Sequence, residues 1–299
     1  MTAVTARTAG VHEVWVASPK PTPVTLAAAA VAGADAVLAV GGAQAIAALA
    51  FGTETIEPVD VIVGPGNRWV TAAKQLVAGQ VGIDMLAGPS ELLVLADGHA
   101  DPATIAADLL AQAEHDADAM PVLVTTAPEL VDAVEAALTR QLEGLPTRSV
   151  AEPALQRGYA VVCGSLERAV AVCDALAPEH LQLSVTRPAE LLPRLRHYGA
   201  AFLGEGSAEV LGDYGAGPNH VLPTAGGARF GGGLSVLDFS RVRTWMTLDG
   251  SPEALVRDAA ALARLEGLEG HARAAERRTA PSAARHPRRE VRTWVRCAP

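Results

Sequence analysis

Short β-branched runs alternate with Ala-rich segments along this chain, and this alternation restricts the possible folds more than any other feature. Strands are predicted over residues 11–18, 34–40 and 59–64, and each is followed by a helix-prone stretch. These stretches are long enough for crossover connections, which are nearly always right-handed between parallel strands. The pattern therefore predicts a parallel βαβ arrangement, to which residues 81–86 add a further strand.

A second round of the same alternation begins at residue 91. Asp101 and Pro102 open its first helix, because the carboxylate caps free amides and proline loses no hydrogen bond at the first helical position. A long helix is predicted from Ala127 to Gly144. The strands of this round are predicted over residues 91–97, 121–126, 159–165 and 181–185. Two successive α/β units are therefore the expected fold.

These elements divide the 299 residues into four parts. The first α/β domain is predicted over residues 1–90 and the second over residues 91–243. Residues 244–278 form a helical segment, in which residues 251–278 are predicted as one long helix. We expect the tail, residues 279–299, to be disordered, because it is rich in Pro, Arg and Ala and lies at a chain end.

Charge and cysteine content argue against several classes of protein. The net charge of -9 disfavours nucleic-acid binding, which depends on Lys and Arg. Cys163, Cys173 and Cys297 are odd in number and lack CxxC spacing, so neither a disulfide framework nor a zinc ribbon is indicated. The sequence shows no signal peptide and no apolar run long enough to span a membrane. We expect a cytoplasmic protein in a reducing compartment that binds neither nucleic acid nor membrane.

Three Gly-rich turns occupy places where α/β proteins bind ligands. They are VGGAQ (40–44), VGPGN (63–67) and AGPSE (87–91), and each carries a polar side chain. Ligands bind beyond the carboxyl ends of parallel strands, where glycine lets the backbone approach and helix N-termini attract anions. A single turn of this kind is more often only a turn, and none matches GxGxxG. The three together predict a binding cleft.

Two pairs of side chains are candidates for chemistry. Gln112 and His115 lie three apart on a predicted helix, so they share one face. Glu179 and His180 lie at the junction between a helix and a strand, where a carboxylate and an imidazole can divide acid and base work near neutral pH. A structural histidine and an ordinary surface Glu-His pair are the alternatives.

Residues 212–236 are the most irregular segment of the sequence. They contain Asp213, Asn219 and His220 among many glycines. A loop of this length is usually either functional or disordered. The apolar residues on both sides of it favour function.

A possible metal site combines residues from three of these segments. Glu266 and His271 lie five apart near the end of the last predicted helix, where a solvated helix face would also explain them. A divalent ion such as zinc accepts two imidazole nitrogens and two oxygens. That donor set is offered by Gln112, His115, Asp213 and His271. Sequence spacing does not prove that these residues meet.

Eight motifs, in order along the chain, resemble the histidinol dehydrogenase family. They are GGAQAIAAL, VGPGN, GIDMLAGPSELLVLAD, DLLAQAEHD, APEHLQL, GDYGAGPNHVLPT, GGLSVLDF and EGLEGHA, and the resemblance extends over residues 10–278. It implies two incomplete Rossmann-like α/β domains with parallel sheets, a C-terminal helical extension, and a zinc-dependent homodimer. The implied reaction is the NAD-linked oxidation of L-histidinol to L-histidine through L-histidinaldehyde, in two hydride transfers that end histidine biosynthesis.

The resemblance also implies a role for individual residues. Gln44 and Asn67 match NAD-contacting positions, which places the cofactor on the first domain, and Glu179 and His180 match the catalytic pair. The zinc ligands, one ion per subunit, would be Gln112, His115, Asp213 and His271. The substrate would contact Ser90, Gln112, His115, His180, Asp213, His220, Glu266 and His271. In the implied dimer the segment of residues 244–278 reaches a partner subunit and donates His271 and Glu266 to its site.

The chemistry expected of this site divides between two side chains. Zinc would fix the imidazole and amino groups of histidinol, and His180 would take the hydroxyl proton as hydride leaves for NAD. Glu179 would activate the water that hydrates the aldehyde, and His180 would again be the base in the second oxidation.

Two features keep other interpretations open. Family members carry a region before the position of Met1, including a Tyr-Val-Pro-Gly-Gly stretch whose aromatic ring contacts the cofactor, and this sequence has no such stretch. A late start codon, a genuine truncation with lost activity, and a missing part supplied by another chain are the alternatives. The chain is also compatible with a paralogue that oxidises another small polar alcohol, or with a non-catalytic zinc-binding remnant.

Overall fold

The computed structural model describes residues 1–248 and 252–278. The predicted tail over residues 279–299, and Ser251 at the start of the predicted long helix, lie outside the described residues. Contacts divide the chain into a first unit of residues 1–241 and a second unit that begins at Val242. The predicted domain boundary at residue 90 falls inside the first unit and stays a prediction.

A five-stranded parallel sheet forms the second half of the first unit. Its order is β7-β6-β5-β8-β9, so the chain moves outward from β5 on one side and then crosses to the other side at β8. Four of its strands confirm the predicted α/β pattern, whereas β9 was not predicted, because its sequence AAFL has no β-branched residue. The strands are β5 (Glu91–Ala96), β6 (Met120–Thr125), β7 (Tyr159–Val162), β8 (His180–Ser184) and β9 (Ala200–Leu203).

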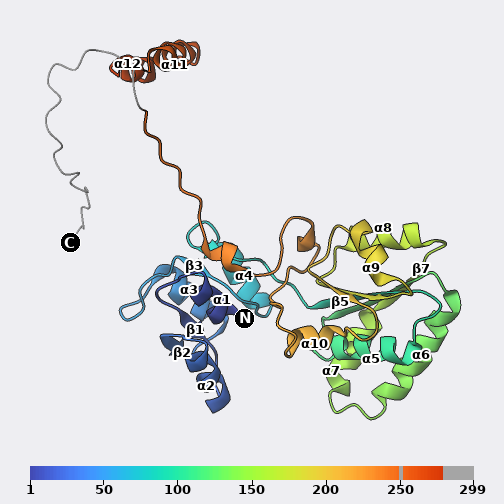
Figure 1. Ribbon diagram of the computed structural model, residues 1–299. Helices are drawn as coiled ribbons and strands as arrows, with labels where there is room; N and C mark the ends of the chain where they lie inside the picture. The colour runs from blue at the N-terminus through green and yellow to red at the C-terminus, as the bar shows by residue number, and fades with distance from the viewer. Residues whose placement is uncertain (249–251, 279–299) are drawn as a thin grey trace. The chain divides into compact units, whose positions relative to one another are not determined.

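Helices cover both faces of this sheet (Figure 1). Leu93 and Leu95 of β5 belong to the core beneath α8 and α9, and Leu92 and Val94 belong to the core beneath α5 and α6. All six residues of β5 are buried, as is typical of a central parallel strand. The helices are α5 (Pro102–Ala113), α6 (Pro128–Leu142) and α7 (Arg148–Arg157) on one face, and α8 (Leu166–Leu176) and α9 (Pro188–Leu191) on the other.

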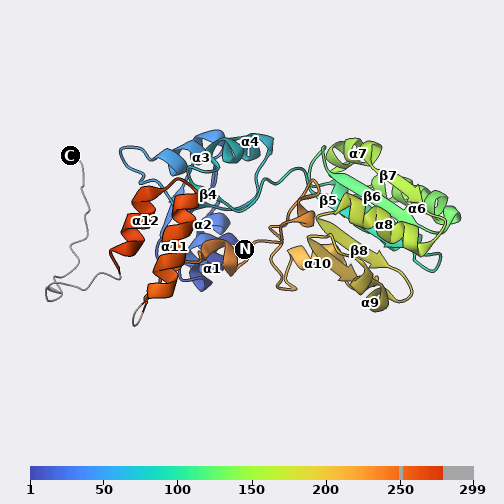
Figure 2. The same ribbon diagram turned by 90° about the horizontal axis from the view of Figure 1, so that it is seen from above.

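The first 90 residues form two smaller parallel sheets, β1-β2 and β3-β4, rather than one continuous sheet. The predicted strands and helices are present, although the strands are shorter than predicted, and the first helix was not predicted. α3 and α4 lie side by side (Figure 2) and share a small core with Ile62 of β3. The elements are α1 (Thr2–Thr8), β1 (Trp15–Ala17), α2 (Pro23–Val31), β2 (Ala36–Leu38), α3 (Gly42–Phe51), β3 (Val61–Ile62), α4 (Arg68–Val77) and β4 (Gly82–Ile83).

A buried ion pair fixes the turn between β3 and α4. Lys74 of α4 pairs with Asp84, which follows β4, and both side chains are almost fully buried. Lys74 Nζ donates to the Gly64 carbonyl at 2.9 Å, and the Gly64 amide donates to Asp84 Oδ2 at 2.7 Å. Gly64 has a φ of +110°, a conformation that favours glycine. The two charged residues therefore hold both backbone polar groups of the glycine that opens the VGPGN turn.

The segment after β9 contains more regular structure than the sequence indicated. A short helix, α10 (Glu209–Asp213), ends inside the segment predicted as irregular, and two short 3-10 helices follow, η2 (Gly227–Arg229) and η3 (Val236–Phe239). α10 packs near α5. Gly212 makes close packing against β9 possible, because a Cβ at this position would lie 2.7 Å from the Phe202 ring.

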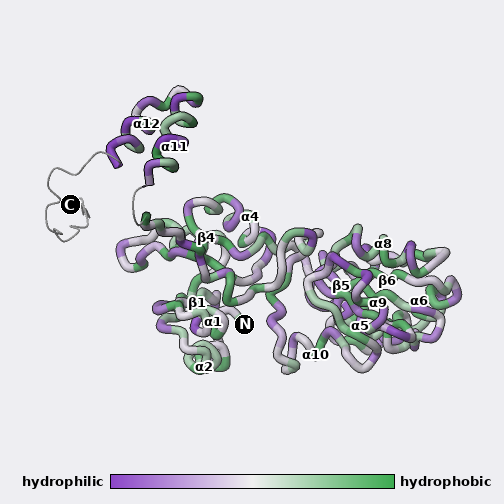
Figure 3. The backbone as a smooth tube through the Cα atoms, turned by 45° about the horizontal axis from the view of Figure 1, so that its top comes forward, coloured by the Kyte–Doolittle hydropathy of each residue, from purple (hydrophilic) through white to green (hydrophobic). Residues whose placement is uncertain are grey.

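The described residues of the second unit, 242–248 and 252–278, contain two helices, α11 (Glu253–Leu265) and α12 (Glu269–Glu276). The prediction of one long helix is therefore wrong. Gly267 has a φ of +77°, and this left-handed residue ends α11. Hydrophilic and hydrophobic residues alternate along both helices (Figure 3). No helix within residues 1–248 and 252–278 is both long and apolar enough to cross a bilayer.

Candidate active site

Several polar side chains gather at the amino ends of β5 and β8. Ser90 directly precedes β5, and Glu179 and His180 stand where β8 begins. β5 and β8 are parallel neighbours with Leu92 opposite His180, so these residues come together. Gly199 lies against the pair, and a Cβ there would lie only 2.5 Å from the carbonyl oxygen of Glu179. The close approach of the chain before β9 therefore requires glycine.

His180 presents one free ring nitrogen. Its Nδ1 lies 3.1 Å from the backbone oxygen of Glu91, and since a carbonyl only accepts, Nδ1 carries the proton of this hydrogen bond. Nε2 then bears the lone pair, and it is buried without a hydrogen-bond partner among the described residues. Burial lowers the pKa of His180 to about 4. At neutral pH this imidazole is a neutral proton acceptor.

Glu179 is a buried carboxyl group held by two donors. Ser90 Oγ donates to Glu179 Oε2 at 2.6 Å, and the backbone amide of Glu91 donates to the same oxygen at 2.9 Å. Burial outweighs these hydrogen bonds and raises the pKa of Glu179 to about 7. Glu179 Oε2 also lies 3.6 Å from His180 Nδ1. A carboxyl group that titrates near neutral pH can both accept and release a proton in a reaction.

Candidate metal ligands meet where α10 passes the end of α5. One ligand atom each from His115, Glu209 and Asp213 lies within 4.8 Å of the other two. His115 follows the end of α5 rather than lying on it as predicted, and its amide donates to the Gln112 carbonyl. Gln112 is completely buried, and neither atom of its side-chain amide has a partner among the described residues. An imidazole and two carboxylates gathered in this way fit a divalent cation, and the unpartnered Gln112 amide, three residues before His115, is a further candidate donor.

Glu209 links this cluster to Glu179 and His180. Its Oε1 lies 3.9 Å from His180 Nε2. Burial, together with the nearby carboxylates of Asp213 and Asp108, raises the pKa of Glu209 to about 7. The Phe202 ring supports the arrangement, with its centroid 5.9 Å from that of the His180 ring. His180 and the candidate metal ligands therefore form one continuous site.

Glu209 was not predicted as a site residue. It lies four residues before Asp213, a spacing that places two side chains on one face of a helix. That signal was hidden because residues 212–236 were predicted as irregular, and no helix was predicted to carry the pair. Only the structure shows that α10 extends to Asp213.

His220 lies beside this cluster, with its Nδ1 4.0 Å from Asp213 Oδ1. The neighbouring Asn219 does not join it, because Asn219 Nδ2 donates to Thr5 Oγ1 at 3.1 Å. The irregular segment therefore contributes Asp213 and His220 to the site and uses Asn219 to contact α1.

Two further predicted site residues belong to the second unit, which is described by itself. Glu266 follows α11 and His271 lies on α12, and both are exposed. Their proposed approach to the metal stays a prediction.

The predicted NAD-contacting residues begin two helices of the first 90 residues. Gln44 lies in the first turn of α3, which follows β2, and Asn67 precedes α4, which follows β3. Asn67 Oδ1 accepts hydrogen bonds from the amides of Trp69 and Val70, both at 3.1 Å, so its amide nitrogen stays free to face a ligand. Gly66 provides room, because a Cβ there would lie 2.5 Å from Val70. Two exposed glycine turns at helix N-termini fit a dinucleotide phosphate.

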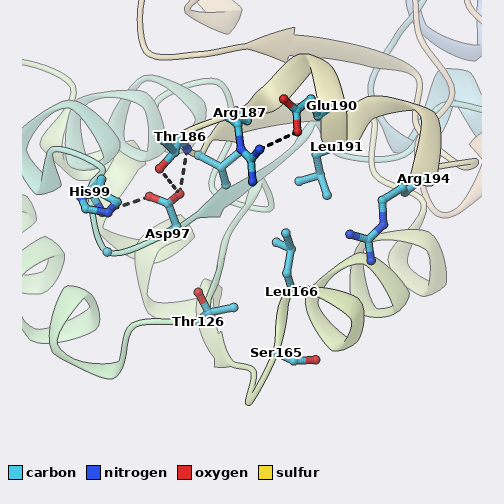
Figure 4. Close-up of a pocket in the computed structure, with 12 residues that line it drawn as sticks. Asp97, His99, Thr126, Ser165, Leu166, Thr186, Arg187, Glu190, Leu191 and Arg194 are labelled. Carbon is cyan, nitrogen blue, oxygen red and sulfur yellow. Dashed lines mark hydrogen bonds and ion pairs between the residues drawn. The ribbon is translucent and has the colours of Figure 1, made fainter.

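The carboxyl edge of the five-stranded sheet, where a ligand would be expected in an α/β fold, lacks this cluster. A cavity of about 580 Å³ lies there (Figure 4), lined by residues that follow β5, β6 and β8, including Asp97, Thr126 and Thr186. Its charged groups are already paired: Asp97 accepts from Thr186, and Arg187 pairs with Glu190. The unpartnered His180 Nε2 and Glu209 Oε1 lie at the opposite, amino edge.

Comparison with known proteins identifies the family of the chain. The family model for histidinol dehydrogenase matches residues 1–279. The chain belongs to the histidinol dehydrogenase family. A histidinol dehydrogenase of Thermus thermophilus is 55% identical over 280 residues, which cover 93% of this chain and 68% of the relative. One of Parasynechococcus marenigrum is 51% identical over 285 residues, which cover 93% of this chain and 65% of the relative.

A solved structure supports the same relationship. The crystal structure of histidinol dehydrogenase from Elizabethkingia anophelis has a TM-score of 0.86 and 38% sequence identity, and the match covers 93% of this chain and 66% of that one. The chain thus spans about two thirds of the length of the histidinol dehydrogenases it matches. The fold class predicted from sequence, α/β with parallel sheets, is confirmed.

Proposed function

We propose that the chain oxidises L-histidinol to L-histidine through L-histidinaldehyde, with zinc bound and NAD as the oxidant. The observation that carries this proposal is the neutral, buried imidazole of His180, whose unpartnered Nε2 lies beside a cluster of candidate metal ligands. Family membership supports the same substrate. These reactions would end histidine biosynthesis.

The two oxidations divide between His180 and Glu179. His180 Nε2 accepts the hydroxyl proton of histidinol, and the Nδ1 hydrogen bond to Glu91 steadies the imidazolium that results. Glu179, oriented by Ser90, takes a proton from the water that adds to the aldehyde. His180 releases its first proton to water, and it then accepts the hydroxyl proton of the aldehyde hydrate in the second oxidation. NAD, held on the first 90 residues near Gln44 and Asn67, would accept the hydride of each step.

The metal-binding residues orient the substrate for this base. Zinc bound by Gln112, His115 and Asp213, with His271 as a further ligand, would fix the imidazole and amino groups of histidinol and polarise its polar groups. We assign Ser90, His220 and Glu266 to contacts with the substrate. We also propose a homodimer in which His271 and Glu266 come from the partner subunit.

The remaining proposals concern the roles of the domains and the cellular compartment. We keep residues 1–90 as the cofactor domain and residues 91–243 as the domain of metal and base, with residues 244–278 as the segment that reaches the partner. Cys163 and Cys173 are buried free thiols, which suits a reducing, cytoplasmic compartment.

The direct test is NADH formation by the purified chain with L-histidinol, NAD and zinc. We expect about two NADH per histidinol, lost on adding a chelator. His180→Asn should lower both oxidation steps by roughly 10²- to 10⁴-fold while zinc stays bound. Unchanged turnover in this variant would contradict the role of His180 as the base.

A mixing experiment tests the shared site. Hybrids of a His271→Ala subunit and a His180→Asn subunit should regain part of the activity, because one of their two sites carries neither change. Verified heterodimers without regained activity would show that each site is built from a single chain.

A further inference from the structure

Glu91, the first residue of β5, contacts both Glu179 and His180 through its backbone. Its amide donates to Glu179 Oε2 at 2.9 Å, and its carbonyl oxygen accepts from His180 Nδ1 at 3.1 Å. Any residue other than proline could make these two backbone contacts at the start of β5. Glu91 is nevertheless only 7% exposed, and a buried carboxyl group is costly unless specific partners hold it.

The carboxyl group of Glu91 joins two backbone segments that are remote in sequence. Glu91 Oε1 accepts from the Ala225 amide at 2.8 Å, and Glu91 Oε2 accepts from the Glu179 amide at 3.4 Å. The first hydrogen bond has an ordinary length, and the second is long. A carboxylate can serve both amides because both of its oxygens accept, whereas a glutamine side chain has only one accepting oxygen.

The backbone is unusual where Glu91 holds it at Ala225. Ala225 has a φ of +52° and Gly226 a φ of +74°, and a left-handed conformation is uncommon for a residue other than glycine. Such conformations persist only where the surrounding structure fixes them. The buried side chain of Thr224 provides a second link, because its Oγ1 accepts from the Gly88 amide. The AGPSE turn and the turn at residues 224–226 are therefore clamped together beside Glu179.

We infer that Glu91 is a positioning residue for the proposed oxidation, and that its carboxylate holds the backbone of Glu179 against the turn at residues 224–226. The inference rests on the proposed function, because it takes the role of Glu179 in activating water from there. A displacement of about 1 Å at a reacting group can lower a rate by about 10²-fold. Glu91 therefore acts on the rate through Glu179 and does not itself touch the reacting atoms.

The charge of Glu91 has a second effect on Glu179. Burial is the main cause of the raised pKa of Glu179; the hydrogen bonds from Ser90 and from the Glu91 amide oppose it. The carboxylates of Glu91 and Glu209 raise this pKa further, and the neutral imidazole of His180 also faces Glu179. Removing the charge of Glu91 should lower the pKa of Glu179. The aldehyde step requires the charged form of Glu179, so it should then level off at a lower pH.

The test compares Glu91→Gln with a matched change at the other end of β5. Glu91→Gln keeps the size of the side chain, but one of the two amides loses its acceptor. Asp97→Asn is the control, because Asp97 Oδ2 accepts from the Thr186 amide at 2.7 Å and from Thr186 Oγ1 at 2.8 Å. This carboxylate links the segments that follow β5 and β8 in a similar manner, but at the carboxyl edge of the sheet.

Single-turnover rates with L-histidinaldehyde, measured on the full 299-residue chain with zinc and NAD, give the main readout. Glu91→Gln should be about 10- to 100-fold slower than the unchanged chain, and its rate should level off at a lower pH. Asp97→Asn should keep both the rate and the pH profile. The KM for NAD should stay unchanged in both variants, because the residues proposed to contact NAD lie elsewhere.

Glu91→Asp separates the bridge from the charge. Its side chain is one methylene shorter, so it cannot reach both amides, but it keeps the negative charge. We expect a slower aldehyde step with a pH profile close to that of the unchanged chain. Far-UV circular dichroism establishes which variants are folded. If Glu91→Gln does not fold, Glu91→Asp carries the test, and an unchanged rate in the folded variant would overturn the inference.

The outcomes separate this inference from the proposed function. If the unchanged chain forms no NADH from L-histidinol or L-histidinaldehyde, the proposed function fails and this inference fails with it. If the unchanged chain is active and Glu91→Gln matches it in rate and pH profile, only the inference is overturned. Equal slowing in Glu91→Gln and Asp97→Asn with an unmoved pH profile would also overturn it, because that result shows a general loss of structure. Slowing and a shifted pH profile in Glu91→Gln alone establish Glu91 as a positioning residue.

Discussion

Residues 1–90 and residues 91–241 share the same alternation of strands and helices, but their strands are buried to different extents. The strands of the first region have two or three residues each, and most of these are only partly buried. β5 in the second region has six residues, all buried. The first region exposes its turns, including Asn67, whereas the second holds Glu179 and His180 away from water. The exposed turns of residues 1–90 suit the proposed binding of an exchangeable cofactor. The buried side chains of residues 91–241 suit groups whose protonation is set by burial.

The largest difference in stability between the two regions should come from breaking the buried ion pair of residues 1–90. Lys74→Met leaves Asp84 buried without its partner, and we expect a loss of about 3–5 kcal/mol in the free energy of unfolding. Hydrogen exchange should show the loss in α4 and its turn, with β5 still protected. Adding Asp84→Asn removes the stranded charge and should recover part of the stability. Equal loss of protection in β5 would show that the two regions unfold as one.

The second region should show an unusual dependence of stability on pH. Burial raises the pKa of Glu179 from 4.5 to about 7, so between these values the folded chain binds a proton that the unfolded chain releases. The contribution of Glu179 to the stability of the metal-free chain should therefore fall as pH rises from about 5 to 7, by up to about 1.4 kcal/mol per pH unit. Glu179→Gln should reduce that slope in chelator-containing denaturant titrations. An identical slope in both proteins would contradict the shift.

The same carboxyl group should separate the two oxidation steps. His180, with its pKa lowered to about 4, is already neutral above pH 5, so the alcohol step should change little between pH 6 and 8. The aldehyde step should rise about tenfold per pH unit below pH 7 and then level off, because the role proposed for Glu179 requires its charged form. Single-turnover rates with L-histidinol and with L-histidinaldehyde measure each step. Parallel pH profiles would remove the proposed role of Glu179 in activating water.

Two helix caps offer a smaller, matched test across the regions. Asn67 caps α4, and Ser165 Oγ caps α8 by accepting from the Arg168 amide at 3.3 Å. Replacing either by Ala should cost about 1 kcal/mol. Of these two variants only Asn67→Ala should also raise the KM for NAD, because Asn67 is proposed to contact it and Ser165 is not. Steady-state kinetics with varied NAD give the comparison, and an equal rise in Ser165→Ala would point to a general loss of stability.

The smallest effect should come from an exposed ion pair. Arg148 and Glu152 lie one turn apart on α7, and both side chains are about half exposed. Solvent and salt screen such pairs, so Arg148→Ala should leave the denaturation midpoint unchanged. A clear loss of stability would mean that this pair on α7 contributes more to the stability of residues 91–241 than its exposure suggests.

Several elements could be predicted because their determinants are local. The buried run at residues 91–97 gave β5, and Asp101 with Pro102 gave the start of α5. The prediction of one helix over residues 251–278 was wrong because of a single local residue, Gly267. Gly267 adopts a left-handed conformation there, and glycine within a helical pattern does not by itself show whether the helix continues.

The sequence by itself determined the α/β class, the place of Glu179 and His180 at a helix-strand junction, and the family to which the motifs point. These depend on residue order and on spacing within one element. Tertiary structure alone decided that the polar cluster lies at the amino edge of the sheet, and that Glu209 joins His115 and Asp213. It also set the proton on His180 Nδ1, through the carbonyl of Glu91 in a neighbouring strand. Burial and distance between segments remote in sequence decide these features, because desolvation and hydrogen bonding act only once the chain has folded.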